Sequence, residues 1–223
     1  MIRVKVQDTR LKVQGTSEKG QGTRHKNQDP NIHDLYLVPY SSSNLSLLKL
    51  FFMEAKTSTD SQIIMTEIVL PNDTNVFGNL MGGRLMYWMD IAAALSAQKH
   101  CNAPVVTASV DNISFENPIE LGNAVHIEAK VTRAFNTSME VHLKVWGEDL
   151  TKQFKYKSNE AYYTFIALDA ARKPKPAPEL IPETEEEKKL FDGALRRRQL
   201  RLILGGKLKP DDATELRALF VKD

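Results

Sequence analysis

The sequence has one cysteine, no long apolar segment and almost no excess of charge. Cys101 is alone among 223 residues, which excludes an internal disulfide framework and favours a reducing, cytoplasmic compartment. No apolar run approaches the roughly 18 residues that cross a bilayer, so we expect no membrane association. Lys and Arg total 30 against 28 Asp and Glu, a net charge of +2, and this balance predicts no basic surface for nucleic acid.

Metal-ligand spacing is also missing. The five histidines form no helical HxxxH pair or other ligand pattern, and each is expected to be a surface or strand residue. We therefore expect neither a metal ion nor a cofactor.

What is present is the composition of a soluble globular protein, with 42% hydrophobic and 26% charged residues. The length allows one main domain with additions at its ends. Residues 1–35 are polar and lack Phe, Trp and Tyr, so they are predicted to be disordered. Regular patterning begins after Met53, a hypothetical translation start. We expect a disordered or non-native extension at 1–55, one domain at 58–175, and a proline-rich exit with a helical tail at 176–223.

Periodicity predicts one strand, a long helix and then four strands. The run GNLMGGRLMYWMDIAAALSAQ is rich in Ala, Leu and Met, which favours a helix from about Gly82 to about His100, buried on most faces. Short connections between the strands imply antiparallel pairing, with the helix on one face of the sheet. The predicted strands are residues 62–70, 105–115, 123–134, 138–147 and 160–169.

The tail EEEKKLFDGALRRRQLRLIL, residues 185–204, is predicted to be a second helix. Acids in its first turns and bases in its last turns suit the helix dipole. Its RRRQLR stretch is expected to form a solvated helix face, with a phosphate contact as the alternative.

Asp90 is the one charged residue between Arg84 and Lys99. A carboxylate inside a buried helix is costly unless it is paired, neutralised or used in chemistry. A hydrogen bond to a neighbouring strand, an exposed position and a catalytic role all remain open for this residue.

The residues before Asp90 favour the catalytic role. Gly82 and Gly83 stand where the helix begins, and free N–H groups at such a position bind negative charge, including the oxyanion that forms when a carbonyl is attacked. Asn79 adds a side-chain amide that can donate to the same carbonyl.

Helix geometry separates these groups within one chain. Asp90 lies seven residues beyond Gly83, which is roughly 10 Å along the axis, whereas a base must approach within ~3 Å of the proton it removes. Both groups can serve one substrate only if they come from different subunits. The sequence therefore predicts a two-fold homodimer with antiparallel helices and shared sites.

Three stretches carry a family resemblance: PNDTNVFGNLMGGRLMYWMD, VTASVDNISFENPIELG and NTSMEVHLKVW. They resemble the acyl-CoA thioesterases, or acyl-CoA hydrolases, of the hotdog fold over about residues 61–175. The resemblance implies an α+β fold in which an antiparallel β-sheet wraps around one long central α-helix, here followed by the C-terminal helical tail. It also implies that Asn79 and Asp90 form the catalytic site across a dimer interface.

The resemblance further implies substrate contacts at Gly82, Gly83, Thr137 and Ser138. Relatives often have Gly-Arg before the Thr-Ser pair, whereas this chain has Phe135–Asn136. This departure argues against an arginine contact to the coenzyme A phosphates from that turn. Homodimers, and hexamers built as trimers of dimers, are also expected from the resemblance.

The predicted function is hydrolysis of fatty acyl-CoA to free fatty acid and coenzyme A, a step in fatty acid metabolism. Asp90 would either activate water or attack the thioester itself. The alternatives are a non-catalytic acyl-CoA sensor and a hotdog acyl-thioester dehydratase. A dehydratase would need a histidine near the helix start, where the sequence has none. The other acid of interest, Asp111, is expected to be structural.

Overall fold

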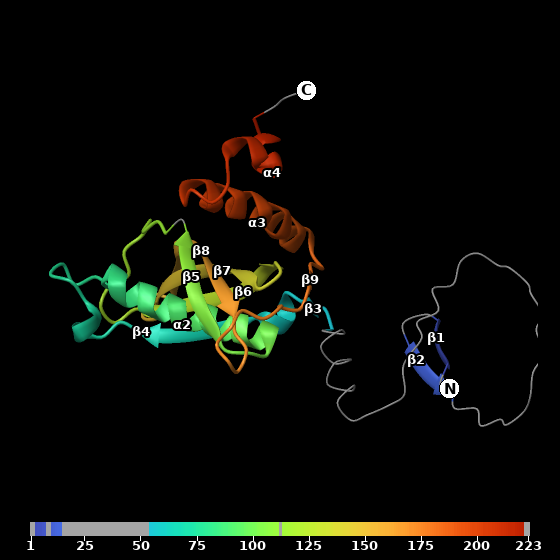
Figure 1. Ribbon diagram of the computed structural model, residues 1–223. Helices are drawn as coiled ribbons and strands as arrows, with labels where there is room; N and C mark the ends of the chain where they lie inside the picture. Colours follow the sequence, from blue (N-terminus) through green and yellow to red (C-terminus); the bar gives the residue numbers. More distant parts are fainter. Residues whose placement is uncertain (1–2, 8–9, 15–53, 112, 221–223) are drawn as a thin grey trace, which may run out of the picture. The chain divides into compact units, whose positions relative to one another are not determined.

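The computed structural model describes residues 3–7, 10–14, 54–111 and 113–220 (Figure 1). The chain divides into two units, Met1–Phe51 and Phe52–Asp223, which are described separately. In the first unit, β1 (Arg3–Gln7) and β2 (Arg10–Gln14) form an antiparallel pair. The alternating apolar and polar residues of RVKVQ and RLKVQ suit strands, and most of the extension expected at 1–55 lies outside the described residues. Met53 lies outside the described residues, as does the hypothesis about it.

The second unit is built on a five-stranded sheet whose neighbouring strands are all antiparallel. The five predicted strands are confirmed, but the last begins six residues earlier than expected, at Phe154, and the strand expected at 105–115 ends at Asp111. The strands β4 and β5 form the two edges of the sheet. In spatial order the strands are β4 (Ile63–Ile68), β6 (Ala124–Ala134), β7 (Ser138–Asp149), β8 (Phe154–Ala167) and β5 (Val105–Asp111).

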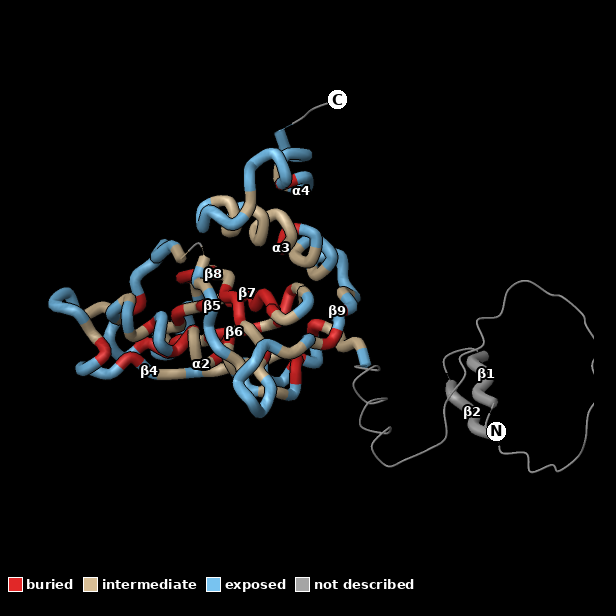
Figure 2. The backbone as a smooth tube through the Cα atoms, in the orientation of Figure 1, coloured by how far each residue is buried: buried red, intermediate tan, exposed pale blue. Residues whose placement is uncertain are grey.

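The long helix α2 (Gly82–Cys101) crosses one face of this sheet, as predicted. Its small residues Ala92 and Ala93 are fully buried against the sheet, and the resulting core is visible as the red segments of α2 and the central strands (Figure 2). The helix ends at Asn102, whose left-handed φ of 49° supplies the C-cap. Within the described residues, no helix is long and apolar enough to cross a membrane.

One expectation about α2 is wrong for the single chain. Its apolar sequence predicts burial on most faces, yet Met86, Tyr87 and Leu95 are 38%, 57% and 45% exposed. A helix that is apolar all round needs cover on every side, and the sheet supplies cover on one side only. The uncovered side is therefore an apolar surface of this chain.

A second helix, α3 (Glu185–Leu204), covers the opposite face of the sheet. Its N-terminus is fixed by a capping box between Thr184 and Glu187, and the short helix α4 (Thr214–Arg217) follows it. The prediction that RRRQLR forms a solvated face is wrong. Arg197 reaches the buried Glu140 of β7, and Arg201 pairs with Asp111 of β5 at 2.6 Å.

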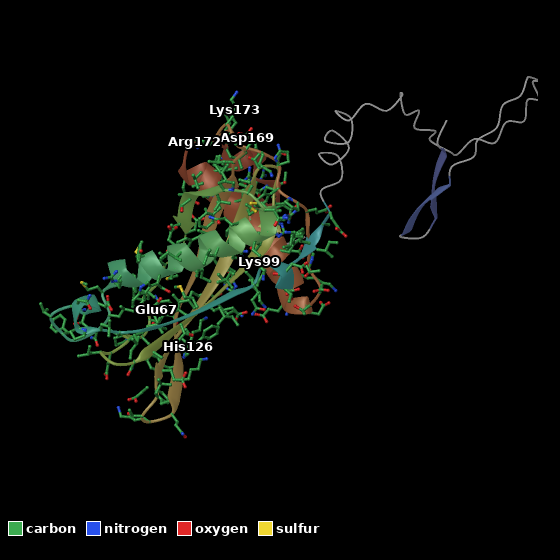
Figure 3. The ribbon with its side chains drawn as sticks, turned by 90° about the horizontal axis from the view of Figure 1, so that it is seen from below. Glu67, Lys99, His126, Asp169, Arg172 and Lys173 are labelled. Atoms are coloured by element: carbon green, nitrogen blue, oxygen red, sulfur yellow. The ribbon has the colours of Figure 1, made fainter. Side chains whose placement is uncertain are left out.

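Near the start of the second unit, β3 (Lys56–Thr57) forms a small parallel pair with β9 (Leu180–Ile181), the strand that precedes α3. Periodicity cannot reveal strands of two residues. Lys56 Nζ also donates to Lys99 O at 2.7 Å and to Asn102 Oδ1 at 3.2 Å, which fixes the C-terminal end of α2, where Figure 3 shows Lys99. The segment after β9 therefore connects to α3, which packs on the same unit.

Candidate active site

Asp73 fixes the start of α2. It is 4% exposed and lies in the turn Pro71–Asp73. Its Oδ1 is 2.7 Å from Arg84 Nε, and its backbone oxygen accepts a hydrogen bond from Met81 N at 2.8 Å. Asp73 was not among the predicted site residues, although an aspartate three residues after Leu70 is a recognisable turn signal, and the Leu70 N–H donates to Asp73 Oδ2.

The first turn of α2 has no side-chain cap, since the N-cap residue is Met81. The early N–H groups of a helix have no partner within the helix, so they are available to a ligand here. Gly82 lines a cleft of about 310 Å³ together with Asn79 and Phe115. A methyl group on Gly82 would lie 3.0 Å from the Phe115 ring, whereas one on Gly83 would meet nothing within 4 Å. The structure therefore brings Asn79 and Gly82 together at this cleft, whereas Gly83 follows in the helix and is not among the residues that line it.

Asn75 also lines this cleft, as do Asn117 and Asn159. Asn75 Oδ1 accepts hydrogen bonds from Phe77 N at 2.9 Å and from Asn79 N at 3.2 Å. These bonds fix the amide with its carbonyl oxygen occupied, so that only its NH₂ group can face a ligand. The turn depends on Gly78, whose φ is 77°. The sequence analysis did not select Asn75.

Asp90 lies near the middle of α2 and is partly buried. Thr107 Oγ1, on the edge strand β5, donates a hydrogen bond of 2.9 Å to Asp90 Oδ1. The ladder is irregular between Thr107 and Ser109, and such a bulge re-aims a side chain. The carboxylate is thus held at the border between core and the uncovered side of α2, and Thr107 is its partner.

The helix keeps Asp90 away from the cleft of its own chain. Seven residues separate it from Gly83, or roughly 10 Å of helix, and Asp90 is not among the residues that line the cleft. The predicted separation between Asp90 and the Gly-Gly turn follows directly from the observed helix.

Thr137 and Ser138 lie elsewhere, at the turn between β6 and β7. Thr137 O accepts from Ala167 N at 3.0 Å, and Ser138 Oγ accepts from Arg198 Nη1 at 3.1 Å. The guanidinium groups of Arg133 and Arg198 lie 5.7 Å and 4.5 Å from the Phe135 ring. Burial, and then the charge of Arg201, lower the pKa of Arg198. Two arginines therefore stand at a turn that has none in its own sequence.

No group of three or more His, Cys, Asp or Glu side chains with metal-binding geometry occurs in the ranges given above.

Comparison with known proteins identifies the family to which the chain belongs. A model of the "Thioesterase superfamily" matches residues 77–153. A solved apo-hexameric acyl-CoA thioesterase is 38% identical with a TM-score of 0.66, and the match covers 68% of this chain and 98% of that one. The acyl-CoA hydrolase of Staphylococcus aureus, solved with butyryl coenzyme A and coenzyme A, is 36% identical with a TM-score of 0.64, covering 69% and 96%. The chain belongs to the hotdog-fold acyl-CoA thioesterases.

The chain also matches a much longer relative. It is 42% identical to mouse acyl-coenzyme A thioesterase 11 over 149 residues, which is 67% of this chain but only a quarter (25%) of that protein. Further structures of the S. aureus hydrolase carry alanine in place of an aspartate, a threonine or an asparagine. The expected hotdog fold is thus confirmed.

Proposed function

We propose that this thioesterase hydrolyses fatty acyl-CoA to free fatty acid and coenzyme A at sites shared between two subunits. Each site would combine the Gly82–Gly83 turn and cleft asparagines of one subunit with Asp90 of the other. The observation that carries the proposal is the position of Asp90. Thr107 holds it at the uncovered side of α2, about 10 Å along the helix from the turn of its own chain.

The uncovered surface supports a dimer. Apolar side chains are exposed on α2 at Tyr87 and Leu95 and on the adjacent edge strand β5 at Val106 and Val110. An edge strand and an exposed apolar helix face both call for cover. A two-fold axis beside α2 would place the two helices antiparallel and bring each Asp90 toward the neighbouring Gly-Gly turn. The hexameric relative supports further assembly of such dimers.

The choice of catalytic amide lies between Asn79 and Asn75. In the S. aureus hydrolase, the substituted asparagine lies fifteen residues before the substituted aspartate, and the threonine lies seventeen residues after it. The same steps from Asp90 lead to Asn75 and Thr107. This spacing supports Asn75 as the amide that donates to the thioester carbonyl, with Asn79 beside it in the cleft.

In the reaction, the amide and the N–H groups of Gly82 and Gly83 polarise the thioester carbonyl. Asp90 of the other subunit either removes a proton from water, whose oxygen attacks the carbonyl carbon, or attacks that carbon itself, in which case a water must later hydrolyse the acyl–Asp90 anhydride to release the fatty acid. The carbon–sulfur bond then breaks, and the coenzyme A thiolate takes up a proton. Thr107 keeps one carboxylate oxygen occupied, so that the other is directed at the reaction.

Thr137 and Ser138 are proposed to contact coenzyme A. Their turn is flanked by Arg133 and Arg198, which form no ion pair in the part of the chain that the structure describes. Guanidinium groups bind phosphate well. The positive charge that the turn itself lacks would then come from Arg133 on β6 and Arg198 on α3.

The two alternative functions, an acyl-thioester dehydratase and a non-catalytic acyl-CoA sensor, receive less support than the hydrolase. A dehydratase would use a histidine at the helix start, but no histidine of the described residues lines the cleft. His126 lies on β6, next to the strand that carries Glu67 (Figure 3), and pairs with Glu148 at 2.6 Å. A non-catalytic sensor would have no need of a carboxylate aligned by Thr107.

The proposed organisation is a catalytic domain at 58–175 with a tail that packs on its outer face. A cytoplasmic location is also proposed, supported by the single cysteine, which is buried and free.

The test is release of free thiol from short, medium and long acyl-CoA. Asp90→Asn should lose at least about a hundredfold in kcat, as expected when a general base is removed. Asn75→Ala and Asn79→Ala distinguish the two amides, and Thr107→Val should be slower than Thr107→Ser, which keeps the hydroxyl. Binding of acyl-CoA by the wild type without any turnover would support the sensor and overturn the hydrolase.

A further inference from the structure

A tyrosine hydroxyl lies buried near Asp90 without a hydrogen-bond partner. Tyr163, on β8, is 1% exposed, and its hydroxyl has no partner within bonding distance among the described residues. Buried tyrosine hydroxyls usually find a partner, because an unsatisfied polar group lowers stability. A hydroxyl in this position needs a reason other than folding.

The sheet register places this hydroxyl on the same side as Asp90. Tyr163 pairs with Val110 of β5, and Phe165, two positions along β8, pairs with Thr107. Residues two apart on a strand share a face and lie about 7 Å apart. Tyr163 and Thr107 therefore both face α2, and Thr107 donates directly to Asp90.

The electrostatics agree with this placement. Burial, and then the negative charge of Asp90, raise the pKa of Tyr163 to about 12. The phenol therefore keeps its proton throughout the neutral range and acts as a hydrogen-bond donor. Asp90 accepts from Thr107 through Oδ1, which leaves its Oδ2 for the water that it activates.

Tyr162, the residue before Tyr163 on β8, has a different environment. Tyr162 faces the opposite side of the sheet, stacks on His142 with 4.8 Å between ring centroids, and lies under the guanidinium of Arg197 at 3.9 Å. Its hydroxyl approaches Glu160 Oε1 at 3.5 Å. Tyr162 thus has protein partners on its own face, whereas Tyr163 has a buried donor and no acceptor.

Resting on the proposed function, we propose that Tyr163 is a further catalytic residue, whose hydroxyl donates a hydrogen bond to the water that Asp90 activates. In this step the water proton passes to Asp90, the water oxygen forms a bond to the thioester carbon, and the carbon–sulfur bond breaks. The thiolate then takes the proton from Asp90, while Tyr163 keeps its own proton. Asp90 is accordingly a general base and not a nucleophile.

The test compares Tyr163→Phe with Tyr162→Phe, the same chemical change on the other face of the same strand. Tyr163→Phe should lower kcat about tenfold or more, within the range for groups that align a reacting water, and change KM less than about twofold. Its Tm should equal or exceed that of the wild type, because the unsatisfied hydroxyl is gone. Tyr162→Phe should retain the wild-type kcat.

Asp90→Asn, measured in parallel, separates the two proposals. If Asp90→Asn is inactive and Tyr163→Phe keeps a kcat within twofold of the wild type, the role of Tyr163 is refuted and the shared site stands. If Asp90→Asn is fully active, the proposed function itself fails. A lower Tm that accounts for the lost activity of Tyr163→Phe would show a structural role and overturn the inference. The double variant should be no slower than Asp90→Asn, and an additive loss would also overturn it.

Discussion

At the scale of single residues, Gly82 and Gly83 differ in what surrounds them. A methyl group on Gly82 would press on the Phe115 ring at 3.0 Å, whereas the space over Gly83 is open for 4 Å. In the proposed dimer, that open space is where a thioester and the other subunit approach. Alanine substitutions at Gly82 and Gly83 therefore distinguish an effect on packing within the chain from an effect on the binding of substrate or of the other subunit.

We predict that Gly83→Ala folds normally but loses activity. Its free energy of unfolding should be unchanged or higher by about 0.4–1 kcal/mol, since alanine restricts the unfolded chain, while kcat/KM should fall roughly tenfold because the methyl group obstructs the approach of substrate. Denaturant unfolding and thiol release measure the two quantities. Gly82→Ala is the companion variant, in which the Phe115 ring must also move. Full activity in Gly83→Ala would show that nothing approaches this glycine.

Residue types and spacing suggested part of the candidate site. Asp90, Gly82 and Asn79 follow from one continuous stretch, because a charge in an apolar helix and glycines at its start are visible in the sequence. Thr107 and Tyr163 do not, since each comes from another strand and becomes a neighbour of Asp90 only through the sheet register. Hydrogen bonds between distant segments are a property of the fold and leave no periodic signal.

At the scale of elements, α3 is held on the sheet by a buried ion pair. Glu140 of β7 is fully buried, and Arg197 donates to both of its carboxylate oxygens, at 3.1 Å from Nε and 2.7 Å from Nη2. Thr132 Oγ1 adds a third hydrogen bond of 2.7 Å. The carboxylate is well satisfied as long as α3 stays in place.

We predict that Arg197→Ala lowers the free energy of unfolding by about 3–5 kcal/mol, because Glu140 is left as an uncompensated buried charge. Arg217→Ala is the matched control. Arg217 and Asp211 form an exposed pair at 3.8 Å, and such pairs contribute little, so no measurable change is expected. Urea unfolding provides both values, and equal stability of the two variants would contradict the buried ion pair.

This contact also shows where sequence patterns stop being informative. Alternation along β7 identified Val141 and Leu143 as core and placed Glu140 and His142 on the other face, and that assignment of faces is correct. The pattern did not show that α3 covers the polar face, because alternation reports only the polarity of a face. Acids on a sheet can be buried by a helix whose arginines satisfy them.

His100 makes the C-terminal end of α2 sensitive to acid. Its Nε2 lies 2.9 Å from Pro178 O, so this nitrogen donates, and its buried Nδ1 has no partner among the described residues. Burial lowers the pKa of His100 below the ordinary 6.5. The unfolded chain therefore binds a proton that the folded chain refuses, and stability is fully present above pH 6.5 and declines below it.

We predict a fall in the free energy of unfolding between pH 6.5 and pH 5, of at most about 1.4 kcal/mol per pH unit for this one group. His100→Gln can still donate to Pro178 O but does not titrate, so it should show a smaller fall. Burial also lowers the pKa of His142, which accounts for a remaining slope. Parallel pH profiles for the variant and the wild type would exclude His100 as a source.

At the scale of the whole molecule, the uncovered side of α2 and the edge strand β5 are where a second copy would bind. The proposal of two subunits comes from the sequence, because it depends only on the rise of a helix between Gly83 and Asp90. The surface itself could not, since the exposed Tyr87 and Leu95 look like core residues in the sequence. Their exposure in one chain and the separation of the two groups point to the same interface.

Subunit mixing tests this arrangement. Asn75→Ala/Asn79→Ala and Asp90→Ala should each be inactive as homodimers. After random exchange, half of the dimers are mixed, and each mixed dimer holds one site with intact asparagines from one subunit and intact Asp90 from the other, so about a quarter of all sites should recover. Differently tagged subunits verify the exchange. Mixing the wild type with a chain that carries all three substitutions is the control, because a shared site leaves every mixed dimer inactive, whereas a site contained in one chain leaves each of them half active.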